Sequence, residues 1–312
     1  MHLFFYGPNT FLMNRDIARL KERYREKSGG DLNLTTLEGE ALTYGDFAAQ
    51  VQAMPLLASS RLIIIRDIFA CKNREVLDKI KEDLGKISES TVVIFTQTGE
   101  PDKRLGLFKA LNKPKISKYF KQVSPLEIIK FIKDEVALRG GGIEPKAAEM
   151  LADYVGTDLW QLDNEVEKLT VYCGKRQIEK EDVEKLVSKN VTSNVFEMIN
   201  DLTAGRKARA LCGLEDLLTT GEPPLKILAV VNYQFRSIAQ VKEAAEKSQN
   251  QYAISKEAGM APFQVARILP ILKNFSWPRI AQIYQKLVQT DLEIKTGETN
   301  GAAGLKDFIL GF

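Results

Sequence analysis

Residues 3–14 read Leu3-Phe4-Phe5-Tyr6-Gly7-Pro8-Asn9-Thr10-Phe11-Leu12-Met13-Asn14, an apolar strand pattern followed by a glycine turn and the start of a helix pattern. A strand, a turn and a helix in this order form the phosphate-binding loop of P-loop nucleotidases, with the motif G-x-x-x-x-G-K-[ST]. That motif supplies glycine amides around the phosphates, a lysine on the β and γ oxygens and a hydroxyl for magnesium. Gly7 is present, but Leu12, Met13 and Asn14 occupy the other three positions. The segment therefore predicts the shape of a nucleotide-binding domain without the groups that hold a nucleotide.

The first 123 residues alternate between short apolar runs and helical patterns. The runs predict strands at 3–6, 32–37, 62–66, 92–96 and 116–120, and helical spacing predicts helices near 11–27, 44–54, 73–84 and 103–112. The runs at 62–66 and 92–96 are continuously apolar, which is typical of strands covered on both faces. Alternating strands and helices predict an α/β domain at 1–123, with a parallel sheet and flanking helices.

After residue 123 the strand patterns stop and helical patterns remain. Ser124-Pro125-Leu126-Glu127 is a capping-box pattern with proline at the first helical position, so a helix is expected to begin there. The glycine run at 140–142 is the clearest hinge candidate. The sequence predicts two all-α domains after the α/β domain, a small one at 124–190 and a second one at 191–312.

The composition is that of an ordinary globular protein, with 312 residues, 44% hydrophobic and 27% charged. The net charge of +3 permits a local basic patch but does not require nucleic acid as a partner. Cys71, Cys173 and Cys212 are far apart and His2 is the only histidine, so no zinc site is expected. Scattered cysteines indicate a reducing compartment, and no apolar run approaches the ~20 residues that span a bilayer. We expect a cytoplasmic protein with no signal for secretion and no membrane partner.

No arrangement of residues predicts catalysis by the chain itself. His2 is at the N-terminus, and paired carboxylates such as Glu165 and Glu167 lie on charged helix patterns typical of solvated faces. Asp67 follows the strand pattern at 62–66, where a magnesium ligand would be expected, but it is a lone carboxylate. Arg61 either offers an arginine finger to a neighbouring ATPase or ends a turn, and the turn is the simpler interpretation. We expect no catalytic residue, no metal and no cofactor.

The segment between the second helix pattern and the third strand pattern carries several large apolar residues. Phe47, Val51 and Met54 are spaced at i, i+4 and i+7, which predicts a core-facing helical stripe. A proline then ends the helix, because the residue before a proline is driven out of the α region. Leu56 and Leu57 follow in a turn, where they are either tucked under the domain or exposed as an anchor for a partner. Periodicity alone favours the tucked position.

These residues belong to a pattern that runs nearly from end to end. Its parts are Phe5-Tyr6-Gly7-Pro8-Asn9-Thr10-Phe11-Leu12, Met54-Pro55-Leu56-Leu57-Ala58-Ser59-Ser60-Arg61, Asp102-Lys103-Arg104, Phe108-Lys109-Ala110-Leu111, Asp158-Leu159, Asn164-Glu165-Val166-Glu167-Lys168-Leu169, Asn194-Val195-Phe196, Gln234-Phe235-Arg236 and Asp291-Leu292-Glu293-Ile294-Lys295. In this order and spacing the chain resembles the DNA polymerase III delta subunit family, the clamp-opening subunits of bacterial sliding-clamp loaders. No single part is as specific as a phosphate-loop motif.

The resemblance implies three domains. The first, 1–123, would be a RecA-like AAA+ domain that lacks a functional P-loop and binds the clamp. The second, 124–190, would be a small helical lid, and the third, 191–312, a helical collar for oligomerisation. Val195 and Phe196 would then be core residues at the start of the collar.

The resemblance also implies a clamp-binding site. Leu56 and Leu57 would form a wedge that enters the clamp, with Met54 beside them. Pro55 departs from the polar residue that many relatives carry, which would stiffen the turn.

The implied function is to bind and open the ring-shaped sliding clamp during DNA replication, while partner subunits bind and hydrolyse ATP. The implied partners are the clamp (beta subunit), the gamma/tau and delta prime loader subunits, and primer-template DNA within the assembled complex. The chain would be part of the DNA polymerase III holoenzyme, a DNA-directed DNA polymerase and nucleotidyltransferase complex.

Three alternatives remain open at this point: an AAA+ ATPase with a divergent P-loop, another clamp-loader subunit, or a helical DNA-binding protein. The zinc-ligand cysteines and the Ser-Arg-Cys motif expected of other loader subunits are missing from the sequence, as is a basic stripe for DNA recognition.

Overall fold

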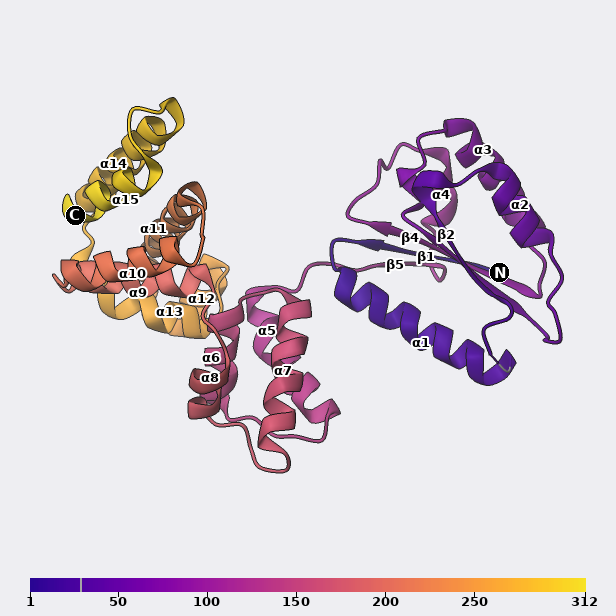
Figure 1. Cartoon of the computed structure of the whole chain (residues 1–312), viewed down its shortest axis with the longest axis horizontal. Helices are drawn as coiled ribbons and strands as arrows, with labels where there is room; N and C mark the ends of the chain where they lie inside the picture. Colours follow the sequence, from indigo (N-terminus) through magenta and orange to yellow (C-terminus); the bar gives the residue numbers. More distant parts are fainter. Residues whose placement is uncertain (29) are drawn as a thin grey trace. The chain divides into compact units, whose positions relative to one another are not determined.

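The computed structural model describes residues 1–28 and 30–312, and it divides the chain into two compact units, Met1–Val123 and Ser124–Phe312 (Figure 1). The first unit combines a sheet with helices, and the second is built from helices. The α/β class expected for the first part and the all-α class expected for the rest are both confirmed.

The first unit contains a five-stranded sheet in which every neighbouring pair of strands is parallel. The strands are β1 (His2–Gly7), β2 (Leu34–Glu38), β3 (Arg61–Arg66), β4 (Thr91–Thr98) and β5 (Ser117–Tyr119). Their order across the sheet is β2-β3-β4-β1-β5, so β2 and β5 are the edges. All five predicted strands are found, although β2 begins at Leu34, later than the predicted start at residue 32.

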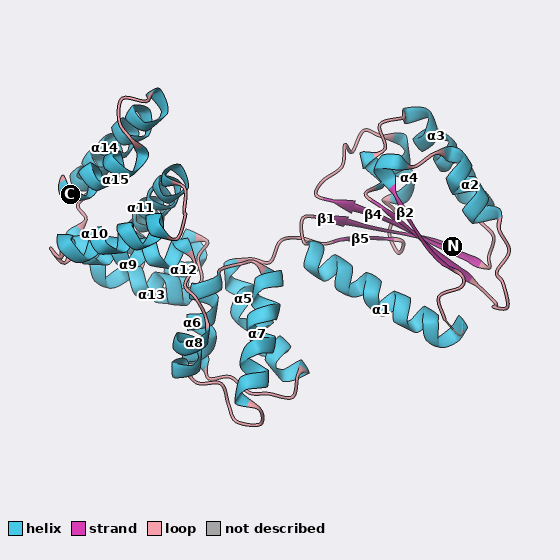
Figure 2. Ribbon diagram, viewed as in Figure 1, coloured by secondary structure: helices cyan, strands magenta, loops and turns pink. Residues whose placement is uncertain are grey.

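Helices cover both faces of this sheet. They are α1 (Thr10–Ser28), α2 (Tyr44–Gln52), α3 (Arg74–Asp83) and α4 (Gly106–Leu111), with short 3-10 helices η1 (Gly39–Ala41), η2 (Ile68–Ala70) and η3 (Leu84–Lys86). Figure 2 shows α1 on one face and α2, α3 and α4 on the opposite face. The first unit therefore has three layers, with the sheet in the middle.

Strand β3 shows why its sequence reads as continuously apolar. Successive side chains of a strand point to opposite faces. Ile63 and Ile65 are buried in the cluster beneath α2, α3 and α4, and Ile64 is buried in the cluster beneath α1 together with Met13. Both faces of β3 are covered, so neither set of alternate positions can be polar.

The second unit begins where the capping-box pattern predicted. Its helices are α5 (Pro125–Leu138), α6 (Pro145–Val155), α7 (Leu159–Cys173), α8 (Lys180–Leu186), α9 (Val191–Thr203), α10 (Lys207–Thr219), α11 (Pro224–Lys247), α12 (Gln251–Ala258), α13 (Pro262–Ile268), α14 (Trp277–Thr296) and α15 (Gly301–Leu310), with the 3-10 helix η4 (Leu269–Asn274). The Glu127 carboxylate accepts a hydrogen bond from the backbone N–H of Ser124 at 3.0 Å, as a capping box requires. None of the described helices is long and apolar enough to cross a membrane.

Residues 191–312 have a hydrophobic core of their own. Val195 and Phe196 are buried in it, which confirms that they are core residues. The proposed division of the second unit into a lid at 124–190 and a collar at 191–312 stays a prediction, because the two parts form one compact unit.

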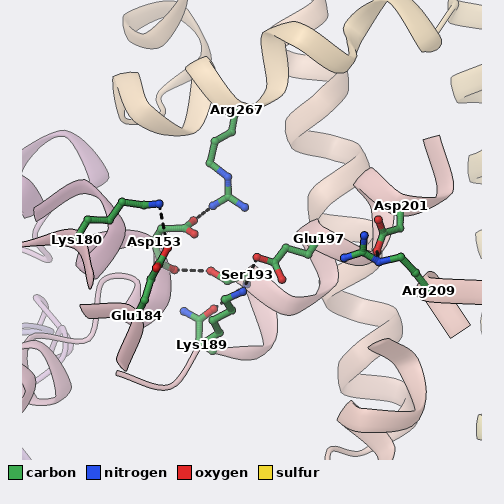
Figure 3. Close-up of polar contacts among 10 residues, drawn as sticks. Asp153, Lys180, Glu184, Lys189, Ser193, Glu197, Asp201, Arg209 and Arg267 are labelled. Atoms are coloured by element: carbon green, nitrogen blue, oxygen red, sulfur yellow. Dashed lines mark hydrogen bonds and ion pairs between the residues drawn. The ribbon is translucent and has the colours of Figure 1, made fainter. Parts of the chain in front are cut away.

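Polar side chains join these two parts of the second unit (Figure 3). Arg267 of α13 forms an ion pair with Asp153 of α6, and its guanidinium lies 4.0 Å from the centre of the Phe196 ring. The Ser193 hydroxyl donates to the backbone carbonyl of Asp153 at 2.6 Å. Burial lowers the pKa of Arg267 to about 10, so this guanidinium depends on the carboxylate for compensation of its lost hydration.

Candidate functional site

The segment after β1 lies where a phosphate-binding loop would be, but its polar groups form hydrogen bonds with other parts of the protein. Gly7 has a φ of +130°, and a Cβ at this position would lie 2.4 Å from the carbonyl oxygen of Phe120. The backbone N–H of Asn9 donates to the same carbonyl at 3.1 Å, and its side chain donates to the carbonyl of Lys121 at 3.1 Å. The Asn9 side-chain oxygen also accepts from the backbone N–H of Leu12 at 3.0 Å. The backbone N–H of Asn9, which would face a phosphate, therefore already donates to a carbonyl of the protein.

The other positions of the expected nucleotide site have structural roles. Met13 stands at the lysine position of the motif and is buried in the core beneath α1. A lysine there would have to bury its ammonium group. The Asp67 carboxylate accepts from the backbone N–H of Thr98 at 2.6 Å, at the end of β4. The described residues contain no group of His, Cys, Asp and Glu side chains that could hold a metal ion.

The segment between α2 and β3 exposes the apolar residues that the sequence singled out. Met54 is 88% exposed, Leu56 is 61% exposed and Leu57 is 92% exposed. Large apolar side chains gathered on one exposed turn are typical of a site for a partner protein. We call residues 53–60 the apolar turn.

Periodicity was wrong for Met54 and for the two leucines. Phe47 and Val51 are buried as predicted, but α2 ends at Gln52 and Met54 lies outside it. Ala53 is already extended, with φ −66° and ψ 132°. The following proline disfavours an α conformation for Met54. The core-facing stripe therefore ends at Val51 and does not include Met54.

Leu57 has an unusual backbone conformation for a leucine. Its φ is +55°, in the left-handed region that glycine adopts freely and other residues avoid. Its side chain is not held there by core packing, because it is almost fully exposed. A strained residue whose side chain points into solvent is a reason to look for a function.

Arg61, the first residue after the apolar turn, connects α2 to the sheet. The Arg61 guanidinium donates to the Thr35 hydroxyl at 3.2 Å and to the Gln50 side-chain oxygen, so it joins the end of α2 to β2. This position agrees with the turn interpretation of Arg61 and gives no support to an arginine finger.

Two residues that contact the apolar turn were missed by the sequence analysis. Asn33 and Tyr24 bond to its backbone from 23 and 36 residues away in the chain. No local pattern marks such residues: Asn33 falls in the strand predicted at 32–37, which proves to be an edge of the sheet and not an inner strand.

Comparisons with known proteins agree along the whole chain. The family described as DNA polymerase III, delta subunit, matches residues 3–121, and the family described as DNA polymerase III delta subunit, C-terminal domain, matches residues 192–312. DNA polymerase III subunit delta of Bacillus subtilis is 26% identical, over 98% of this chain and 90% of that protein. The probable DNA polymerase III subunit delta of Aquifex aeolicus is 24% identical, over 97% of this chain and 89% of that protein.

A solved structure gives the same answer. The DNA clamp loader delta protein of Bacillus subtilis matches with a TM-score of 0.59 and 25% identity, over 99% of this chain and 94% of that chain. The two family matches together cover most of the sequence, and the relatives align over nearly their full lengths. The chain belongs to the DNA polymerase III delta subunit family.

Proposed function

We propose that this chain is the subunit of a sliding-clamp loader that binds and opens the clamp, and that Met54, Leu56 and Leu57 of the apolar turn are its clamp-binding residues. The observation that carries this proposal is the exposure of three large apolar side chains on one turn, with Leu57 in a strained conformation. The solved relative is itself named a DNA clamp loader delta protein, which supports the same role here.

The physical basis is the burial of an apolar anchor. Two leucines that enter a pocket contribute roughly 3–5 kcal/mol before ordering costs. That free energy stabilises the clamp in whichever conformation best fits the turn. A wedge that fits an open interface better than a closed one shifts the clamp toward the open ring.

Other subunits would supply the chemistry of the loading cycle. We infer that the gamma/tau and delta prime subunits assemble with this chain through residues 191–312, and that ATP is bound and hydrolysed by those partners. Primer-template DNA would be held within the assembled complex, in the cytoplasm where replication takes place. The chain would contribute to the DNA polymerase III holoenzyme without catalysis of its own.

The main alternative, an AAA+ ATPase with a divergent P-loop, has no observation in its favour. The bonds of Asn9 to Leu12, Phe120 and Lys121 occupy groups that a phosphate would need. The absence of nucleotide binding remains a prediction, and it is tested below.

The experiment that tests the proposal is the double substitution Leu56→Ala with Leu57→Ala. It should weaken binding of the sliding clamp by roughly 2–4 kcal/mol, about 30- to 1000-fold, measured by titration. The melting temperature should stay close to that of the wild type, because both side chains are exposed.

A matched control is Leu126→Ala with Leu138→Ala, which removes two other exposed leucines from α5. The control should bind the clamp like the wild type. A large fall in melting temperature with clamp affinity intact would mean that Leu56 and Leu57 are core residues and that the proposal is wrong.

A further inference from the structure

The shape of the apolar turn is not set by its own backbone. Within the described part of the chain, residues 54–60 make no hydrogen bond between backbone groups. An irregular segment of this kind is expected to sample several conformations unless side chains from elsewhere hold it. The contacts that hold the turn therefore decide how Leu56 and Leu57 are presented.

Asn33 is the residue that holds the centre of the turn. It lies directly before β2, and only 2% of its surface is exposed. Its side-chain nitrogen donates to the backbone carbonyl of Leu56 at 2.7 Å, and its side-chain oxygen accepts from the backbone N–H of Leu56 at 2.7 Å. One buried amide thus pairs with both backbone groups of Leu56, in the manner of a neighbouring strand.

Asn33 is itself fixed to the sheet and to α1. Its backbone carbonyl accepts from the backbone N–H of Leu62 in β3 at 2.9 Å. Two residues before Asn33, Asp31 is bonded to Arg25 of α1, whose guanidinium donates to the Asp31 carboxylate at 2.6 Å and lowers the pKa of that carboxyl. The Leu56 backbone is therefore connected to a rigid element through a single side chain.

Tyr24 of α1 holds the end of the turn. Its hydroxyl donates to the backbone carbonyl of Ser60 at 2.7 Å. Asn33 and Tyr24 thus contact the turn at two points, one on each side of the strained residue Leu57.

We propose that Asn33 is the positioning residue of the clamp-binding turn: it holds the Leu56 backbone so that the two leucines stand ready before the clamp arrives. This inference rests on the proposed function of the turn. Without Asn33, Leu57 is free to leave its left-handed conformation, and only a fraction of the molecules then carry the competent turn. Apparent affinity falls in proportion to that fraction.

The kinetics of clamp binding distinguish positioning from contact. Loss of a contact mainly raises the dissociation rate constant. Loss of preorganisation lowers the association rate constant, because fewer molecules are competent, while the bound complex is unchanged. Asn33→Ala should therefore lower the association rate constant for the sliding clamp about tenfold and leave the dissociation rate constant within about twofold of the wild type.

The matched control is Asn9→Ala. Asn9 is also a buried asparagine of the first unit, and its side chain also makes one donated and one accepted bond to backbone groups. Both substitutions should lower the melting temperature by similar amounts, but only Asn33→Ala should slow clamp association. Tyr24→Phe is a milder second variant that keeps the ring, and it should slow association about two- to threefold.

A measurement without the clamp tests the same contact. The Leu56 amide should exchange its proton slowly in the wild type, although it lies in an exposed turn, and rapidly in Asn33→Ala. Fast exchange at Leu56 in the wild type would overturn the inference.

The remaining outcomes separate the inference from the function on which it rests. If Leu56→Ala with Leu57→Ala loses clamp binding while Asn33→Ala and Asn9→Ala associate equally fast, the positioning role is wrong and the proposed function stands. If the double leucine variant binds like the wild type, the proposed function fails and the positioning role fails with it.

Discussion

Leu57→Gly should weaken clamp binding without lowering the free energy of unfolding. With φ at +55°, Leu57 occupies a conformation that costs a leucine about 1–2 kcal/mol and costs glycine almost nothing. Glycine adds about 0.5–1 kcal/mol of conformational entropy to the unfolded chain, which offsets part of the relief. Little burial is lost, because the side chain is 92% exposed. The free energy of unfolding should therefore stay the same or rise by up to about 1 kcal/mol.

The same substitution should weaken clamp binding, although it leaves the fold as stable or more stable. A leucine side chain that becomes buried on association contributes about 1.5–3 kcal/mol. Its removal in Leu57→Gly should weaken clamp binding about 10- to 150-fold. The assay pairs urea unfolding of the chain alone with titration of the sliding clamp.

Leu57→Ala is the matched comparison for the strain. It loses the same apolar contact but keeps a Cβ in the left-handed conformation, so its clamp affinity should match that of the glycine variant. Its free energy of unfolding should be lower than that of the glycine variant by about 1 kcal/mol. A destabilisation of several kcal/mol by Leu57→Gly would show that Leu57 is a core residue, and an unchanged clamp affinity would show that it does not contact the clamp.

Four further predictions concern the rest of the chain. Gly7→Ala should lower the free energy of unfolding by about 2 kcal/mol or more, because its Cβ would overlap backbone atoms. Calorimetry of the wild type with Mg-ATP should show no saturable heat at millimolar nucleotide. A micromolar dissociation constant for Mg-ATP would revive the ATPase alternative. Asp153→Ala should lower the stability of the second unit by about 1–3 kcal/mol in thermal unfolding, because Arg267 keeps a half-buried charge without its carboxylate; an unchanged melting curve would contradict this. The guanidinium of Arg176 lowers the pKa of Asp182, so their pair stabilises the fold fully above the ordinary carboxyl value of 3.8 and loses this contribution as the pH falls below it. Arg176→Gln should therefore reduce the difference in stability between about pH 7 and pH 3, and an equal difference in both proteins would count against the pair.

The sequence predicted the elements of the fold well because their patterns are local. The continuous apolar run in β3 follows from burial on both faces, and the start of α5 follows from the capping box at Ser124. Positions 12–14 lack the glycine, the lysine and the hydroxyl of the phosphate-loop motif, which predicts a loop that is not built for phosphate. What they could not indicate is that the Phe120 backbone lies against Gly7 and that its carbonyl accepts from the Asn9 N–H, because these contacts join residues more than a hundred positions apart.

The apolar turn shows where periodicity fails. Met54 continues the stripe of Phe47 and Val51 in sequence, but the helix ends before it, so the pattern predicted burial for an exposed residue. The resemblance to a known family predicted exposure for this residue and for the two leucines. Asn33 could not be found from the sequence, because its role depends on a turn that lies beside it only in the folded chain.

The most direct test of the clamp-binding turn is methyl NMR of the full chain, with labelled leucine and methionine, on addition of the sliding clamp without nucleotide. The methyl signals of Met54, Leu56 and Leu57 should shift or broaden as these side chains become buried. The signals of Leu126 and Leu138, which are exposed on α5, should stay in place. Clamp binding that leaves the signals of Leu56 and Leu57 unchanged would show that the apolar turn does not contact the clamp.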